Sequence, residues 1–200
     1  MNPLTSTDIA NLHEYELERK DFRSRVIALK ARRRVPLGPL MTLVFENRDT
    51  IRFQVQEMLR VERIVQPDKV RHEIDVYNEL LPGPGEIAAT LFIEITEAER
   101  VQELLDAFVG LDEPGHLVLT IGGERFPALF APGQSRDDRI SAVHYIRFAP
   151  GEAGRRALDA GAEAALEVAH ADYRARQVLS PETLDELRAD LAGEQGLSRG

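Results

Sequence analysis

The sequence predicts an α+β fold, with a mainly antiparallel sheet of five or six strands and helices packed on one face. Three observations support this class. Apolar residues at helical spacing prevail up to residue 81, and short runs of strand-forming residues prevail over 86–170. Between the two lies LPGPG (81–85), which interrupts regular structure. The pattern predicts one α+β domain over 1–179, followed by an acidic terminal helix and a loose tail over 180–200.

The chain is predicted to begin with a long helix and a covered strand. Residues 13–34 place apolar side chains at three- and four-residue steps, which is typical of an amphipathic helix. The basic cluster from Lys30 to Arg34 lies where this helix ends, and cations there complement the helix dipole. Because the net charge is −9 and no aromatic residues interrupt the cluster, we expect no nucleic-acid binding. Residues 39–46 are strand formers that are apolar on both faces, as in a covered strand.

Two further helices are predicted on either side of Pro67. The first begins after a cap at Asn47 or Asp49 and ends at Gln66, because a residue that precedes proline avoids helical backbone. The second covers 67–81 and is opened by Pro67, whose fixed φ angle suits the first helical turn. Both segments carry an apolar stripe, so both are expected to pack against the rest of the domain.

The second half of the chain is predicted to be mostly strand. Gly122 and Gly123 favour a tight hairpin turn, and Pro127 marks the strand that follows as an edge strand or a bulge. The expected elements are a strand (86–95), a helix with a Thr96–Glu99 capping box (96–110), a hairpin (116–130), a loop (133–139), a strand (140–148), a short helix (151–162) and a last strand (164–170). Ser180 then begins the acidic terminal helix.

Composition limits both location and chemistry. The chain contains no cysteine, which excludes disulfides, iron–sulfur ligation and a thiol nucleophile. No apolar run approaches the length of a bilayer span, and the N-terminal residues lack the basic-then-apolar order of a signal peptide. We therefore expect a cytoplasmic protein without a membrane or nucleic-acid partner. The G-x-S-x-G, phosphate-loop, dinucleotide and H-E-x-x-H motifs are also missing, so no catalytic residue or cofactor is assigned.

Three segments together resemble a bacterial family catalogued as domain of unknown function 3501. They are FENRDTIRFQVQEMLRVERI, YNELLPGPGEIAATLFIEI and SAVHYIRF. The resemblance covers about residues 8–175 and leaves out the terminal helix; it implies neither an activity nor catalytic residues. Members of the family are often encoded beside rubrerythrin-like di-iron proteins and iron–sulfur oxidoreductases. The resemblance thereby implies a role near peroxide defence or electron transfer, with such a redox protein as partner; a homo-oligomer is equally compatible with the sequence.

The helix that follows Asn47 carries two glutamates on its apolar side. On a helical wheel, Glu62 falls between Ile51 and Val55, and Glu57 interrupts the opposite flank of the apolar arc. Thr50 and Gln54 lie on the same flank as Glu57, whereas five further polar residues gather in a narrow arc that is expected to face solvent: Asp49, Arg52, Gln56, Arg60 and Arg63. A carboxylate withdrawn from water needs a cation, several hydrogen-bond donors, a metal or a proton.

Partners for these carboxylates are expected on the strands and on the helix after Pro67. His144 alternates with apolar residues in SAVHYIRF, so its side chain should face the core, whereas Arg147 lies on the other face of that strand. The candidate ligand-binding site is one buried polar cluster under the helices: Glu57, Glu62, Tyr77, Glu94, His144 and Arg147. Because the two faces of a strand cannot meet at one point, some of these residues must lie elsewhere.

Three interpretations of the cluster stay open. It is a structural network in which arginine and tyrosine satisfy the glutamates, a pocket in which arginine and histidine hold a small anion, or an iron, manganese or zinc site. The leading hypothesis for function is a cytoplasmic accessory or binding protein that serves an oxidative-stress or electron-transfer system. The alternative is a small-molecule enzyme or a metal-binding protein that uses the Glu/His cluster.

Overall fold

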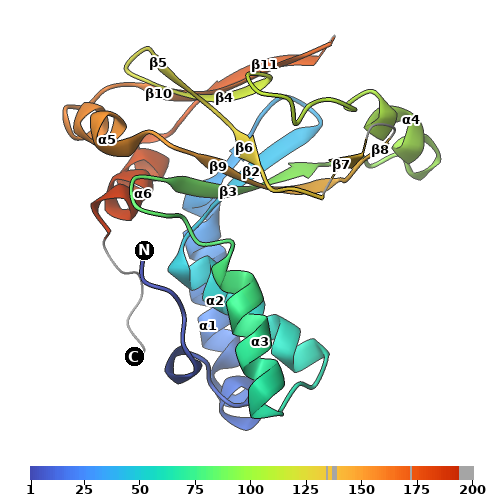
Figure 1. The fold of residues 1–200 in the computed structure, drawn as a ribbon, viewed down its shortest axis with the longest axis vertical. Coiled ribbons are helices and arrows are strands. Elements are labelled where there is room, and N and C mark those ends of the chain that lie inside the picture. Colours follow the sequence, from blue (N-terminus) through green and yellow to red (C-terminus); the bar gives the residue numbers. More distant parts are fainter. Residues whose placement is uncertain (134, 137–138, 172, 194–200) are drawn as a thin grey trace.

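Two antiparallel sheets form a layered body, and a stalk of three helices projects from it (Figure 1). The computed structural model describes residues 1–133, 135–136, 139–171 and 173–193. The α+β class with antiparallel strands is confirmed, but the described strands form two main sheets and a small two-stranded one instead of a single sheet. The helical stalk consists of α1 (Leu12–Arg33), α2 (Arg48–Val61) and α3 (Pro67–Asn78), preceded by a short 3-10 turn, η1 (Ser6–Asp8). Its three helices are those predicted from the sequence, with ends shifted by a few residues.

The first sheet has the strand order β1-β2-β3-β9-β6. Its strands are β1 (Arg34–Pro36), β2 (Met41–Glu46), β3 (Ile87–Ile93), β9 (Val143–Phe148) and β6 (Leu129–Phe130). The register sets Leu43 opposite Leu91 and Leu91 opposite His144, and these side chains point to the same side of the sheet, toward the main core. We call this the inner face. The outer face carries the alternate residues, among them Thr90 and Tyr145, which also lie opposite each other.

The second sheet has the order β11-β10-β4-β5 and packs on the inner face of the first. Its strands are β4 (Leu117–Ile121), β5 (Glu124–Pro127), β10 (Ala164–His170) and β11 (Tyr173–Val178). The expected hairpin turn is confirmed, because Gly122 and Gly123 both have the positive φ angles that a two-residue turn requires. The hairpin ends at Pro127, however, and the next residues cross to the first sheet as β6. The strand predicted at 164–170 is confirmed as β10, but it is not the last strand, because β11 follows it and pairs along it.

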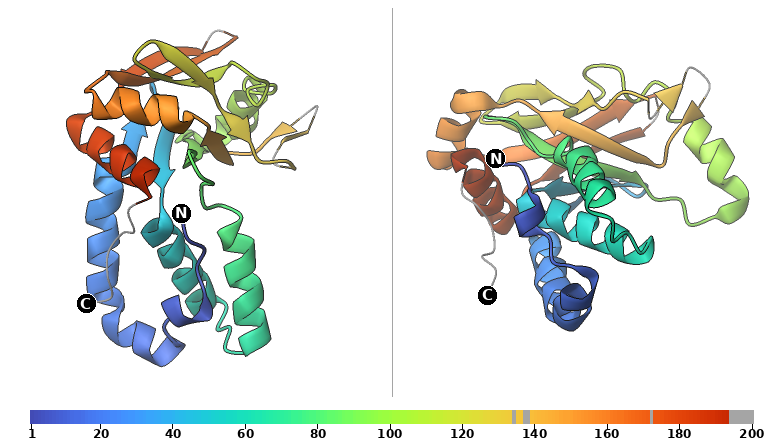
Figure 2. Two further views of the ribbon diagram at one scale, coloured as in Figure 1. Left: turned by 60° about the vertical axis from the view of Figure 1, so that its left-hand side comes forward. Right: turned by 60° about the horizontal axis from the view of Figure 1, so that its bottom comes forward.

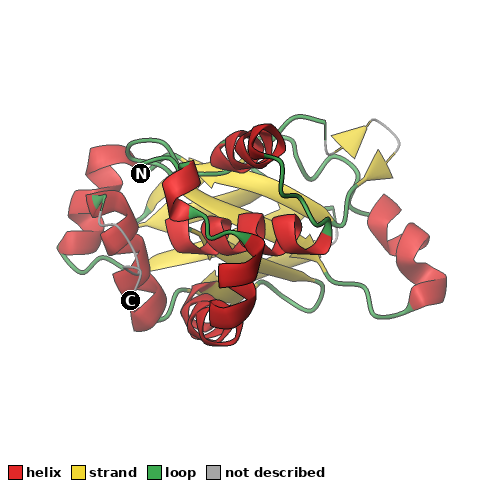
Figure 3. Ribbon diagram, turned by 90° about the horizontal axis from the view of Figure 1, so that it is seen from below, coloured by secondary structure: helices red, strands yellow, loops and turns green. Residues whose placement is uncertain are grey.

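The remaining helices lie at the two ends of the sheets. At one end α5 (Gly151–Asp159) contacts α6 (Pro181–Ala192), and both lie against the sheets (Figure 2). At the other end are a 3-10 turn, η2 (Ala98–Arg100), α4 (Val101–Asp106), and the short strands β7 (Ser135–Arg136) and β8 (Arg139–Ile140). The helix predicted over 96–110 is shorter than expected, and the predicted capping box makes no side-chain hydrogen bond at its start. Part of the loop predicted over 133–139 lies outside the described residues. Seen from below, the stalk helices cross in front of the strands (Figure 3).

The terminal helix α6 is part of the packed body. It begins after a Ser180 cap, as the sequence predicts. Leu187 on α6 is fully buried in the main core, together with Leu179 just before the helix. The sequence predicted a division of the chain at residue 180, but among the described residues α6 packs in the same core as the rest of the chain. Within the described chain, no helix has both the length and the apolar character needed to cross a bilayer.

Candidate functional site

Glu57 is held between two helices of the stalk. The Tyr15 hydroxyl donates to its Oε1 atom at 2.7 Å, and Arg19 donates to both carboxylate oxygens at 2.7 and 2.9 Å. These Arg19 hydrogen bonds, joined by that from Tyr15 and opposed by burial, lower the pKa of Glu57 to about 2. The partners come from α1, not from the strands as predicted. At Glu57 the contacts match the structural interpretation, a network that fixes two helices in register.

Glu62 is exposed, contrary to the prediction. The helix α2 ends at Val61, so Glu62 occupies its C-cap and does not share the packed side of the helix. The solvated face was predicted correctly only in part: Arg63 is exposed and Arg60 is half-buried, but Asp49, Arg52 and Gln56 are all buried. The guanidinium of Arg52 lies 4.7 Å from the Phe22 ring centroid on α1, and Gln56 exchanges two hydrogen bonds with the backbone of Ala10. Both sides of α2 are covered, which a helical wheel cannot reveal.

His144 and Glu94 also lie apart from Glu57. His144 is fully buried on the inner face, as predicted; its Nε2 atom lies 2.8 Å from the Ser141 carbonyl and its ring packs edge-on against Phe130. Burial lowers the pKa of His144 below the usual value for histidine. Glu94 is exposed after β3, where it accepts hydrogen bonds from Arg34 and from Thr42. The predicted single cluster is therefore wrong, because its members lie on different faces and elements.

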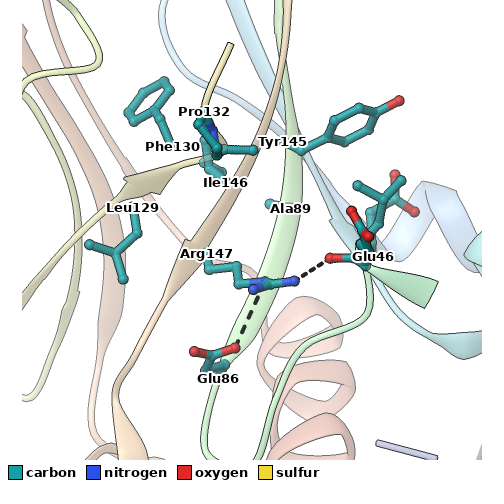
Figure 4. A pocket seen from close by; sticks show the side chains of 12 residues that line it. Glu46, Glu86, Ala89, Leu129, Phe130, Pro132, Tyr145, Ile146 and Arg147 are labelled. Carbon is teal, nitrogen blue, oxygen red and sulfur yellow. Dashed lines mark hydrogen bonds and ion pairs between the residues drawn. The ribbon is translucent and has the colours of Figure 1, made fainter. Parts of the chain in front are cut away.

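Arg147 lines a pocket of about 470 Å³ on the outer face of the first sheet, at the edge formed by β9 and β6. The lining residues are Glu46, Glu79, Leu80, Glu86, Ala89, Leu129, Phe130, Ala131, Pro132, Tyr145, Ile146 and Arg147. Figure 4 shows Arg147 inside this ring, with an ion pair to Glu86 whose closest atoms are 3.8 Å apart. Arg147 also donates to the carbonyls of Glu79 and Leu81, just after α3. We call this cavity the outer-face pocket.

Glu46 is the most deeply buried charged residue of the outer-face pocket, with only 3% of its surface exposed. Its Oε1 atom accepts a hydrogen bond of 2.7 Å from the Thr90 hydroxyl. Its Oε2 atom is buried and has no hydrogen-bond partner among the described residues. The fold therefore keeps a half-satisfied carboxylate beside a cavity, which costs free energy unless a further donor is supplied.

Tyrosines connect the pocket with the helical stalk. Burial raises the pKa of Tyr145, and the nearby charge of Glu46 raises it further, so the phenol stays neutral at physiological pH. Burial also raises the pKa of Tyr77 on α3, and the next contribution comes from Tyr145. Of the six predicted site residues, Arg147 thus lines the pocket and Tyr77 lies close to Tyr145, one of its walls.

Sequence reasoning missed Glu46, although a signal for it was present. In MTLVFE, the side chains of Thr42, Val44 and Glu46 share one face of the strand. Glu46 is the charged residue on that face and stands at the end of the strand. The outer face is recognisable only when the register is known, which sets Glu46 opposite Ala88 and Ala88 opposite Arg147. As for metals, no group of three or more His, Cys, Asp or Glu side chains in the described chain is arranged to hold an ion.

Comparisons with known proteins place the chain in a family and find similar solved structures. The family model described as protein of unknown function (DUF3501) matches residues 3–191, so the match extends through α6, which the resemblance seen in the sequence had left out. A crystal structure from Burkholderia pseudomallei K96243, described as a novel protein of unknown function, is similar to this chain with a TM-score of 0.88 and 32% identity. The similarity covers 95% of this chain and 100% of that one. No curated protein matches the chain.

Proposed function

Because the chain belongs to the DUF3501 family of proteins of unknown function, its own site is the guide to its role, and we propose that it is a binding protein for a small organic molecule. The ligand occupies the outer-face pocket. One observation carries the proposal: the Glu46 carboxylate is buried at the pocket with one oxygen unpartnered among the described residues. A carboxylate in that state is poised to accept a hydrogen bond from a ligand.

The size and lining of the outer-face pocket support binding. A volume of about 470 Å³ falls within the range of small-molecule sites, which combine apolar walls with a few converging polar groups. Leu80, Leu129 and Pro132 supply such a wall, and Glu46 supplies the polar group. Arg147, the lining cation, is already bound to protein carbonyls and to Glu86. This arrangement favours recognition over catalysis, because it offers an acceptor but no nucleophile paired with a base among the described lining residues.

The biological setting of the protein is also proposed. A role in oxidative stress or electron transfer, beside a rubrerythrin-like or iron–sulfur protein, rests on the family resemblance alone. A cytoplasmic location rests on composition, and a homo-oligomer stays open. The alternative of an enzyme or metal protein depended on a meeting of Glu57, Glu62 and His144, and it loses that geometric support because the three residues lie apart.

A thermal-shift screen tests the binding function. The full chain is melted in the presence of a small-molecule library that contains cations, anions and neutral compounds in similar numbers. Ligands that raise the Tm of the wild type should fail to do so with Ala131→Phe, because the added ring occupies the outer-face pocket that Ala131 lines. The matched control is Ala31→Phe, on the exposed side of α1.

Two results would overturn the proposal. One is a screen without any stabilising compound, and the other is a set of shifts that persists undiminished in Ala131→Phe, since the ligands would then bind elsewhere.

A further inference from the structure

We infer that the ligand of the outer-face pocket is an organic cation, in which an ammonium or guanidinium group donates to the Oε2 atom of Glu46 and an apolar body lies against the neighbouring wall. The inference rests on the proposed binding function and specifies the chemical class of the ligand. It is carried by three features of the pocket: an acceptor without a donor among the described residues, an arginine already held by protein carbonyls and a glutamate, and a partly apolar lining.

The polar group that lacks a partner in the pocket is an acceptor. Of the two Glu46 oxygens, Oε1 receives the Thr90 hydroxyl and Oε2 receives nothing from the described residues. Three acidic residues line the pocket, Glu46, Glu79 and Glu86, against one basic residue, Arg147. An excess of negative charge in a partly enclosed site attracts cations and repels anions. A donor with a positive charge therefore satisfies both the hydrogen bonding and the charge of Glu46.

Arg147 is partly engaged by the protein. Its Nη2 atom donates to the carbonyls of Glu79 and Leu81, and its Nε atom lies 3.8 Å from Glu86. Glu86 in turn accepts a hydrogen bond of 2.8 Å from the Gly83 backbone amide. Arg147 and Glu86 thus hold the connection between α3 and β3 against the sheet. An anionic ligand at the Nη2 and Nε atoms would have to compete with these contacts, whereas a cation at Glu46 would disturb none of them.

The remainder of the pocket suits an apolar body. Leu80, Leu129 and Pro132 form an apolar part of its lining. Leu129 is 55% exposed, and an occupant would cover part of this surface. A bare metal ion fits poorly, because the cavity far exceeds the size of an ion and no three metal-ligating side chains converge among the described residues.

Three compounds with the same phenyl ring and different head groups test the ligand class. Phenethylamine, 2-phenylethanol and 3-phenylpropionate carry a cationic, a neutral and an anionic group, and each is titrated into the full chain by isothermal titration calorimetry. The amine should bind about tenfold or more tightly than the alcohol, because a charged hydrogen bond replaces a neutral one. The carboxylate should bind most weakly of the three, or not detectably. This comparison uses the wild type and so does not depend on the folding of any variant.

Variants then assign the preference to Glu46. In Glu46→Gln the amide oxygen can still accept from Thr90, so the fold should persist while the preference for the amine over the alcohol falls about tenfold. The control Glu124→Gln, an exposed residue of β5 outside the pocket, should keep the preference of the wild type.

The outcomes separate the ligand class from the binding function. Tightest binding of the carboxylate, an amine preference that survives Glu46→Gln, or no binding of the three compounds would each overturn the organic-cation inference. None of these results decides the binding function, which the unbiased screen with Ala131→Phe tests independently.

Discussion

Glu57 and Glu46 show two ways in which this fold treats a carboxylate withdrawn from water. Glu57 receives hydrogen bonds from Tyr15 and Arg19, so both of its carboxylate oxygens have donors within the protein. Glu46 receives one hydrogen bond, from Thr90, and its second oxygen has no partner among the described residues. A satisfied carboxylate supports stability, whereas a half-satisfied one beside a pocket supports binding.

Glu57→Gln should destabilise the protein by about 1–3 kcal/mol at pH 7, because Arg19 loses its charged partner. The pKa of Glu57 is about 2 in the folded protein, against an ordinary value of 4.5. Its contribution to stability is therefore complete above about pH 4.5 and is lost as the pH falls toward 2. Urea denaturation between pH 7 and pH 2 should show the difference between wild type and Glu57→Gln shrinking in that window.

The control for this prediction is Glu62→Gln. Glu62 is exposed at the C-cap of α2, so the same chemical change should alter the free energy of unfolding by less than about 0.5 kcal/mol. Equal losses for the two variants, or a Glu57 effect that is independent of pH, would contradict the network around Glu57.

At the scale of elements, α2 is followed by a non-glycine residue, Arg63, with a left-handed backbone. Ile64 donates its backbone amide to the Leu59 carbonyl and Arg63 donates to that of Arg60, the pair of hydrogen bonds that defines a Schellman motif. Arg63, at the position after the C-cap, has a φ of +53°, in the left-handed region that glycine adopts without strain. Ile64 and Leu59 also meet in the apolar cluster of the stalk, which accompanies the motif.

Arg63→Gly should therefore stabilise the protein by about 0.5–1 kcal/mol, since the left-handed backbone costs a residue with a Cβ atom more than it costs glycine. The measurement is the midpoint of thermal or urea unfolding. His72→Gly, at an exposed position inside α3, serves as control and should lose about 1 kcal/mol. If Arg63→Gly destabilises the chain as His72→Gly does, the strain assigned to Arg63 is wrong.

The element scale also shows why part of the site could not be predicted. Helical periodicity found α1, α2 and α3, since each carries an apolar stripe. It could not reveal the buried polar side of α2, because Arg52 and Gln56 are buried by specific contacts with Phe22 and the Ala10 backbone. Glu46 could not be predicted for a related reason. The outer face is formed by three strands in register, and the periodicity along one strand does not show which strands lie beside it.

At the scale of the whole molecule, strand assignments were more predictable than sheet membership. The hairpin pattern up to Phe130 was recognisable, yet β5 and β6 belong to different sheets, because the chain crosses between them at Ala128. The edge strand β11 was missed because most of its residues are exposed and polar, which weakens any apolar alternation. The terminal helix was recognised by its Ser180 cap, but its place in the body depends on distant contacts with α1.

These contacts predict that α6 is required for stability. Arg33, at the end of α1, is only 1% exposed and donates to both carboxylate oxygens of Asp190 at 2.8 Å. Asp190→Ala leaves Glu186 as the remaining carboxylate partner of this guanidinium and should cost about 1.5–3 kcal/mol in urea denaturation. Asp185→Ala, on the same helix, breaks only an exposed pair with Arg188 and should cost less than about 1 kcal/mol. Equal losses in the two variants would contradict the role of the Arg33–Asp190 pair. Truncation at Leu179 tests the whole helix: the burial of Leu187 predicts a large decrease in the unfolding midpoint, and an unchanged midpoint would show that α6 is dispensable.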